Sequence, residues 1–217
     1  MSLIDLMQKR YTTKAFDPSR KLSDEQLKQL EQILRLSPSS TNAQPWHFVI
    51  AATDEGKEKI TSAMQGEFSY NIDKVKKASH VVVLCSRPML TDQHLDQVLA
   101  KEDDDGRFKD DDAREKMRKT RQMYARQHQL TARDIGPWVD KQVYIALGVL
   151  LLGAVELGLD ACPMEGFDQA ALDKALDLTE QGLSSTVVVA LGYRSEDDFN
   201  AKLPKSRLAT DQVITHI

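Results

Sequence analysis

The chain has 217 residues, of which 41% are hydrophobic and 29% are charged, and its formal net charge is −4 at pH 7. This composition is typical of a folded protein with a sizeable core, and it excludes a disordered chain. The slight acidity gives no basic footprint for nucleic acid or an anionic membrane surface. We therefore expect one domain over residues 1–217, with neither nucleic acid nor membrane as a partner.

The N-terminal segment predicts a short helix followed by a basic cluster at residues 9–14. Apolar residues at 3, 4, 6 and 7 give this helix one apolar face. The cations of the cluster could simply favour the helix C-terminus. Alternatively, Arg10, Thr12 and Lys14 stand at alternate positions of an extended turn and would point toward one anion. The start of the chain lacks the pattern of a signal peptide, so we expect a cytoplasmic protein.

A polar loop at residues 37–46 separates a predicted helix from a predicted strand. Ser23 and Gln26 form a capping box that begins the helix, and the apolar run 46–52 predicts the strand. The loop itself contains two prolines, three serines, a threonine, an asparagine and a glutamine. Prolines bias it toward a bent, extended course that presents hydroxyls, amides and backbone N–H groups. It is either a polar connector or a ligand cradle, and its composition leaves both open.

Three apolar runs predict strands, at 46–52, 80–85 and 186–191, and the tail at 213–217 is β-like. The run at 80–85 is apolar throughout, which predicts a central strand. Helical patterns surround these runs, including a short helix from Asp54 and another from Asp168. The sequence therefore predicts an α+β fold with more helix than sheet.

The segment from 91 to 133 reads as helical and strongly charged. Its acidic runs at 102–105 and 110–112 follow no calcium-loop pattern, so we interpret them as a solvated face. The next helix, at 138–157, has an uncharged run of residues 143–155 that is too short for a bilayer and predicts a buried helix. Gly148 and Gly153 would let another backbone approach it. The apolar surface of this helix could be buried against a second subunit.

Several common catalytic patterns are absent from the sequence. No GxGxxG follows a strand, and there is no P-loop, HExxH or GxSxG motif. Cys85 and Cys162 have no zinc-ligand spacing, so we expect no metal site. What remains is a pair of basic clusters, at 9–14 and 203–207, together with polar loops suited to anions and heterocycles.

Segments along the whole chain resemble the oxygen-insensitive NAD(P)H nitroreductase and dihydropteridine reductase family. The resemblance rests on residues 10–16, 37–48, 102–108, 138–144, 158–168 and 203–207, in this order. It implies a nitroreductase-like fold: a small, mostly antiparallel sheet surrounded by helices, with the C-terminal tail exchanged as a strand with the partner subunit. It also implies a homodimer with FMN sites at the interface.

The resemblance also implies a role for individual residues. The cofactor site would comprise Arg10, Tyr11, Thr12, Lys14, Pro38, Ser39, Ser40, Asn42, Asn71, Lys74, Gln142, Pro163, Glu165, Gly166, Lys205 and Arg207. The phosphate and ribityl group would be held by Arg10, Thr12, Lys205 and Arg207. The pyrimidine edge of the ring would be contacted by Lys14, Asn71 and Lys74. Pro163, Glu165 and Gly166 would lie against the other face near N5, while Pro38, Ser39, Ser40, Asn42 and Gln142 would come from the partner. The acceptor or nicotinamide would contact Thr41, Phe68, Tyr70, Arg107, Tyr124 and Phe199.

The implied activity is a ping-pong reduction, in which NADH or NADPH reduces FMN and a nitroaromatic, quinone or pteridine then takes two electrons. No catalytic side chain is required, because the hydride chemistry occurs at FMN N5 with support from Lys14 and Glu165. The alternatives are a flavin reductase and a non-catalytic flavin-binding protein. The chain departs from the family pattern at Tyr11, Tyr124 and the pair Phe68 and Tyr70, which bears on acceptor preference.

Overall fold

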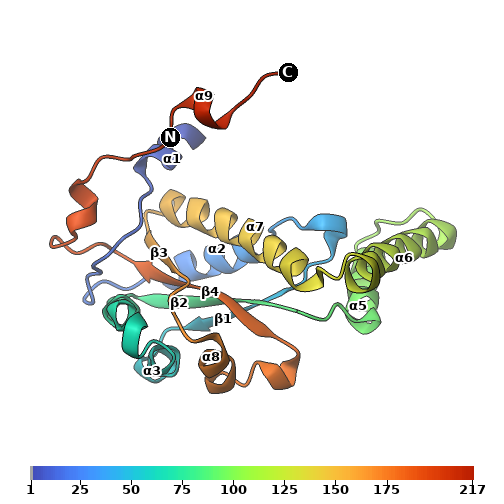
Figure 1. Ribbon diagram of the computed structural model, residues 1–217, viewed down its shortest axis with the longest axis horizontal. Helices are drawn as coiled ribbons and strands as arrows, with labels where there is room; N and C mark the ends of the chain where they lie inside the picture. The colour runs from blue at the N-terminus through green and yellow to red at the C-terminus, as the bar shows by residue number, and fades with distance from the viewer. Residues whose placement is uncertain (1) are drawn as a thin grey trace.

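The computed structural model describes residues 2–217 and is built around one four-stranded antiparallel sheet (Figure 1). The strand order is β1-β2-β4-β3. The strands are β1 (Trp46–Ala51), β2 (His80–Ser86), β3 (Asp160–Met164) and β4 (Ser184–Gly192). Every residue of β2 is buried, as expected for a central strand with no polar face.

Helices cover both faces of the sheet. Alternate residues of β2 face opposite sides, so Val81 and Val83 belong to one core and Val82 and Leu84 to the other. One face is covered by α2 (Asp24–Arg35) and α7 (Ile135–Glu156). The other face is covered by α3 (Asp54–Ser62), α4 (Ile72–Lys77) and α8 (Gln169–Ala175). Figure 1 shows the sheet between these two layers.

Two parts of the chain extend beyond this layered body. At one end, α5 (Asp92–Asp104) and α6 (Asp111–Arg126) pack against each other, and a π-helical turn at Gln127–Thr131 leads back to α7. At the other end lie α1 (Leu3–Lys9) and the C-terminal segment with its short helix α9 (Thr210–Val213) (Figure 1). Neither α1 nor α9 has a buried residue.

The predicted α+β architecture with a small antiparallel sheet is confirmed, and the three predicted strands correspond to β1, β2 and β4. One element was missed: strand β3 was not predicted, because Pro163 within it favours a turn. Residues 214–217 of the β-like tail follow α9 and form no strand within this chain, so their exchange with a partner subunit stays a prediction. The helical segment 91–133 is confirmed, and it consists of α5 and α6 separated at Gly106, whose φ of +71° ends α5. A Cβ at Gly153 of α7 would meet the Ile33 side chain, and one at Gly148 would meet nothing within 4 Å, so the approach of a partner's backbone there stays a prediction.

Helix α7 is long and apolar enough to cross a membrane, but 56% of its most apolar window is buried within the structure. Its buried face contacts α2 and the sheet. A stripe on the other side stays exposed, including Tyr144 and Ile145 at 40% and 42% exposure. The expectation of burial all round is thus met on only part of the helix in a single chain.

Candidate functional site

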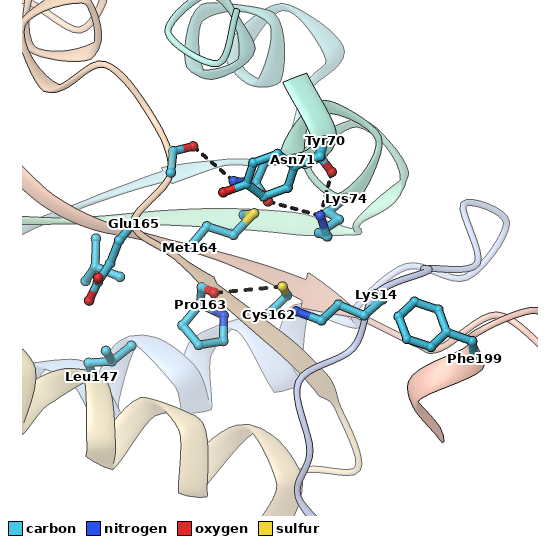
Figure 2. A pocket seen from close by; sticks show the side chains of 12 residues that line it. Lys14, Tyr70, Asn71, Lys74, Leu147, Cys162, Pro163, Met164, Glu165 and Phe199 are labelled. Carbon is cyan, nitrogen blue, oxygen red and sulfur yellow. Dashed lines mark hydrogen bonds between the residues drawn. The ribbon is translucent and has the colours of Figure 1, made fainter. Parts of the chain in front are cut away.

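A cavity of about 700 Å³ opens between strand β3 and the segment that leads into α4. This size is within the range of small-molecule sites. The residues that line this β3 cavity are Lys14, Tyr70, Asn71, Lys74, Leu147, Cys162, Pro163, Met164, Glu165, Gly166, Val187 and Phe199. Figure 2 shows Tyr70, Asn71 and Lys74 on one side, with Pro163 and Cys162 on the other and Phe199 at an edge.

Asn71 and Lys74 form a hydrogen-bonded wall with the turn after β3. The Asn71 Nδ2 donates to the Gly166 carbonyl at 3.0 Å, and Lys74 Nζ donates to Asn71 Oδ1 at 3.0 Å and to the Tyr70 carbonyl at 2.5 Å. Gly166 allows this close approach, because a Cβ there would lie 2.5 Å from Tyr70 Oη and 2.9 Å from Asn71 Nδ2. The wall therefore depends on glycine at this position.

The β3 cavity has an excess of positive charge. Burial lowers the pKa of Lys74, and the nearby Lys14 lowers it further, while burial raises the pKa of the Cys162 thiol. Neither lysine forms an ion pair within residues 2–217. Two uncompensated ammonium groups at one cavity favour a ligand that carries or develops negative charge.

Glu165 supplies the one carboxylate of the β3 cavity, and α7 orients it. The Tyr144 hydroxyl donates to Glu165 Oε1. Burial first, and then this carboxylate, raise the pKa of Tyr144 to about 12, so the hydroxyl keeps its proton at neutral pH. Glu165 is therefore fixed as an acceptor at the cavity wall.

A second, basic pocket of about 370 Å³ lies between the residues after α1 and the segment 200–207. Its cations include Arg10, Lys205 and Arg207, and Lys205 Nζ donates to the Arg10 carbonyl. Burial and the neighbouring Arg207 lower the pKa of Arg10, and slight burial together with both arginines lowers the pKa of Lys205. Within the described chain none of the three forms an ion pair, so this basic pocket suits an anion such as a phosphate.

The β3 cavity and the basic pocket adjoin along the same two segments of chain. Lys14 lines the first and Thr12 the second, while Phe199 lines the first and Asn200 the second. Hydrogen bonds join the segments: Asn200 Nδ2 donates to the Thr12 carbonyl at 2.6 Å, and the Lys14 N–H donates to the Asp198 carboxylate at 3.3 Å. The pair of pockets can therefore accept one elongated ligand with a polar ring and an anionic tail.

The predicted site residues fall into two groups in a single chain. Those brought together at the two pockets are Arg10, Tyr11, Thr12, Lys14, Tyr70, Asn71, Lys74, Pro163, Glu165, Gly166, Phe199, Lys205 and Arg207. Those that line neither of these two pockets are Pro38, Ser39, Ser40, Thr41, Asn42, Phe68, Arg107, Tyr124 and Gln142. Every residue assigned to the partner subunit is in the second group.

Phe68 is placed otherwise than expected, and the structure adds contacts for Tyr11 and Lys14. Phe68 packs against the core and the Gly166 position instead of lining the β3 cavity, because its side chain is turned toward apolar residues. The Tyr11 hydroxyl is already committed to Asp198 at 2.7 Å, and its pKa is raised to about 12 by burial and this bond. Of the three alternate residues, Arg10 and Thr12 line the basic pocket, and Lys14 lines the β3 cavity.

Hydrogen bonds join the polar loop at 37–46 to α5, α6 and α7. The Gln142 side chain accepts a hydrogen bond from the Ser40 N–H at 2.9 Å, and Ser39 Oγ accepts one from the Gln44 N–H at 2.9 Å. Thr41, Asn42 and Gln44 have φ of +52°, +52° and +45°. Left-handed conformations of non-glycine residues cost about 1 kcal/mol or more each, so surrounding contacts must hold them.

A buried ion pair supplies such contacts, and the sequence interpretation missed it. Glu102 is buried and pairs with the buried Arg121 at 2.9 Å, which corrects the expectation that residues 102–105 form a solvated face. Asp103, Asp104 and Asp105 are exposed as expected. The sequence does place an arginine and this acidic run on the same predicted helical segment. A pattern of charges alone, however, does not show which acid of residues 102–105 is buried. Within residues 2–217 no cluster of three or more His, Cys, Asp or Glu could hold a metal ion.

Comparison with known proteins places the chain among flavin-linked reductases. Residues 7–193 match the Nitroreductase family. The chain is 44% identical over 217 residues to the oxygen-insensitive NAD(P)H nitroreductase of Salmonella typhimurium, covering 100% of both. It is 33% identical to the major NAD(P)H-flavin oxidoreductase of Aliivibrio fischeri, covering 98% of this chain and 97% of the relative.

Solved structures show the same fold at low sequence identity. A protein from Exiguobacterium sibiricum, solved in complex with FMN, superposes with a TM-score of 0.84 at 19% identity, covering 100% of this chain and 98% of the other. A nitroreductase family protein from Streptococcus pneumoniae superposes with a TM-score of 0.82 at 19% identity, covering 100% of both chains. The relatives' names and the FMN-bound neighbour agree with the predicted cofactor and electron donor.

Proposed function

The chain belongs to the nitroreductase family, and from this premise we propose that it is a cytoplasmic, homodimeric, FMN-dependent oxidoreductase. It uses NADH or NADPH in a ping-pong cycle to deliver two electrons to nitroaromatics, quinones or pteridines. The observation that carries the proposal is the junction of the β3 cavity with the basic pocket, both of which bear uncompensated positive charge.

The residues present fit FMN by the chemistry of the two pockets. The cations of the basic pocket, Arg10, Lys205 and Arg207, match a phosphate, because arginine donates in a planar fork that binds phosphate oxygens. The wall made by Asn71, Lys74 and Gly166 presents donors and a close-packed backbone to a flat ring. FMN bound here would supply hydride transfer at its N5 atom.

Side chains of the β3 cavity would bind and orient the reactants. Lys14 and Lys74 both line this cavity, and with FMN bound their positive charge would favour the negatively charged, reduced form. Tyr144 holds the Glu165 carboxylate in a fixed direction at the cavity wall. Tyr70 and Phe199 are 64% and 65% exposed at the same cavity, which suits stacking with a flat acceptor.

The second subunit would complete the site. Its loop 37–46 and Gln142 would cover the flavin from the other side, with Thr41, Arg107 and Tyr124 contributing to the acceptor side. The exposed stripe of α7 and the uncovered C-terminal tail support this assembly, because both leave apolar residues in solvent in a single chain. The tail would then add to the partner's sheet.

The first test is flavin content. Purified protein should be yellow, should release FMN on heating, and should recover its colour when FMN is added back. Protein that stays colourless and cannot be loaded with FMN would contradict the proposal.

A second candidate, a flavin reductase that releases reduced FMN, is favoured by the 33% identity to the flavin oxidoreductase of Aliivibrio fischeri. Gel filtration under reducing conditions separates the two. Flavin that stays with the protein supports a bound cofactor, and flavin that elutes separately supports a released product.

A further inference from the structure

The backbone of the polar loop is unusual where it passes closest to α6. Thr41 and Asn42 both have φ of +52°, in the left-handed region. Asparagine tolerates this conformation, but threonine is β-branched and rarely adopts it. Within the loop, the Asn42 N–H donates to the Ser39 carbonyl at 3.0 Å, which fixes a turn without explaining its left-handed course.

Two buried side chains hold these two residues from outside the loop. Arg121 Nε donates to the Thr41 carbonyl at 2.9 Å, and Asn42 Nδ2 donates to Glu102 Oε1 at 2.7 Å. Arg121 Nη2 donates to both oxygens of Glu102, at 2.9 and 3.0 Å. The four residues form a closed circuit in which each strained loop residue contacts one member of the ion pair.

The ion pair between α5 and α6 is almost completely removed from solvent. Arg121 is 2% exposed and Glu102 is 5% exposed. The desolvation of a buried pair can exceed its attraction, so burial alone is weak evidence that the pair adds to stability. Other pairs between α5 and α6, such as Arg114 with Asp103, lie at the surface and do not contact the loop.

We propose that Glu102 and Arg121 are positioning residues that hold Thr41 and Asn42 in the left-handed conformation. Resting on the proposed function, this contact sets the loop in the shape that covers the partner's flavin. The helices α5 and α6 thus act on the flavin site through the loop, although the pair touches neither pocket. Arg107 also contacts Glu102: its backbone N–H donates to the Glu102 backbone carbonyl at 3.0 Å, and its guanidinium lies 3.9 Å from the carboxylate oxygen Oε1.

Two substitutions test the proposal, with a matched control on the adjacent residue. Glu102→Gln removes the charge from the buried pair. Arg121→Lys keeps the positive charge, but a single ammonium group lacks the planar fork that reaches Thr41 and Glu102 together. Asp103→Asn makes the same change as the first variant at the neighbouring, exposed position.

Hydrogen exchange of residues 39–44 in the full-length protein is the first measurement. We expect exchange at least tenfold faster than in the parent in Glu102→Gln and Arg121→Lys, and within twofold of the parent in Asp103→Asn. The second measurement is FMN affinity by fluorescence titration, with a dissociation constant about tenfold higher in the two test variants alone. If Glu102→Gln does not fold, Arg121→Lys decides the outcome.

A pair that only connects α5 to α6 would lower the unfolding midpoint while leaving exchange at 39–44 and FMN affinity as in the parent, and that result would overturn the proposal. An equal effect of Asp103→Asn would overturn it as well. Failure of the parent itself to bind FMN would count against the proposed function. The difference in hydrogen exchange between the two test variants and Asp103→Asn would still decide whether the ion pair holds the loop.

Discussion

Arg207 keeps most of its donors free at the basic pocket. Within its own chain its side chain donates only to the adjacent Ser206 carbonyl, and it forms no ion pair within residues 2–217. Arg10, by contrast, is partly buried, and its carbonyl accepts from Lys205. A side chain with free donors beside two other cations is one that an anion would engage.

Arg207→Ala should weaken FMN binding by about 1.5–3 kcal/mol, the range of a hydrogen bond to a charged group. Fluorescence titration of the flavin-free protein measures the loss. Lys202→Ala is the matched control, because Lys202 is an exposed cation on the preceding segment and does not line the basic pocket. Equal affinities in the two variants would show that the basic pocket is surface charge without a phosphate.

His94 makes the stability of the polar loop depend on pH. It is half-buried, and its Nε2 lies 2.8 Å from the Ala43 carbonyl. Burial lowers the pKa of His94 below its usual value, and the bond to Ala43 only partly opposes this. His94 therefore binds a proton less readily in the folded state than in the unfolded state. Neutral His94 contributes to the free energy of unfolding above about pH 6.5, and this contribution is lost as the pH falls.

The free energy of unfolding of the parent should therefore drop between pH 7.5 and pH 5.5, and His94→Gln should show a smaller drop. Urea denaturation at both pH values measures the difference. His47 and His80 also have a lowered pKa from burial, so part of the drop should remain in the variant. Identical slopes in the parent and the variant would show that His94 does not titrate in this range.

At the scale of elements, the turn after β3 depends on the absence of a side chain at Gly166. Gly166→Ala should push Tyr70 and Asn71 away from β3, destabilise the protein by about 1–3 kcal/mol and weaken FMN binding. Thermal unfolding and flavin titration would measure the two effects. Because Tyr70 Oη is the nearest atom, adding Tyr70→Phe should restore part of both losses; a double variant no better than Gly166→Ala would contradict this packing account.

The sequence predicted those elements that have a simple local pattern of apolar or capping residues. Strands β1, β2 and β4 are apolar runs, and the capping box at Ser23 and Gln26 forms as predicted. Strand β3 was missed because it is short and contains Pro163, and an edge position that tolerates proline is a property of the sheet, not of the segment.

Local sequence patterns also predicted part of the candidate site, but they could not show which residues lie together in space. Local patterns identified the two basic clusters, while their convergence on one pocket, with Lys14 at the adjoining cavity, required the fold. Glu102 could not be distinguished from Asp103 in an acidic run, because only the position of Arg121 in space makes one of them buried. Resemblance, and not pattern, supplied the roles of loop 37–46 and Gln142, which a single chain leaves away from both pockets.

At the scale of the whole molecule, apolar residues stay exposed on α7, including Tyr144 and Ile145, and on α1 and α9, which lie together at one end of the molecule (Figure 1). Ile145→Glu should place a charge in the proposed subunit interface, shift the protein to a monomer and raise the FMN dissociation constant at least tenfold. Light scattering and flavin titration measure the two effects. Met89→Glu is the control at another exposed apolar residue. A monomeric variant that binds FMN as the parent does would show that one chain suffices for the site.

In the proposed function, the β3 cavity and the basic pocket together hold one FMN, which accepts electrons from a nicotinamide and passes them to an acceptor. Its most direct test is a spectrum of the FMN-loaded protein under anaerobic conditions, before and after one equivalent of NADPH or NADH, followed by a quinone. We predict that the visible absorbance of the oxidised flavin bleaches with at least one nicotinamide and returns with the quinone. A spectrum that neither nicotinamide changes would contradict the account and leave a flavin-binding protein without this activity.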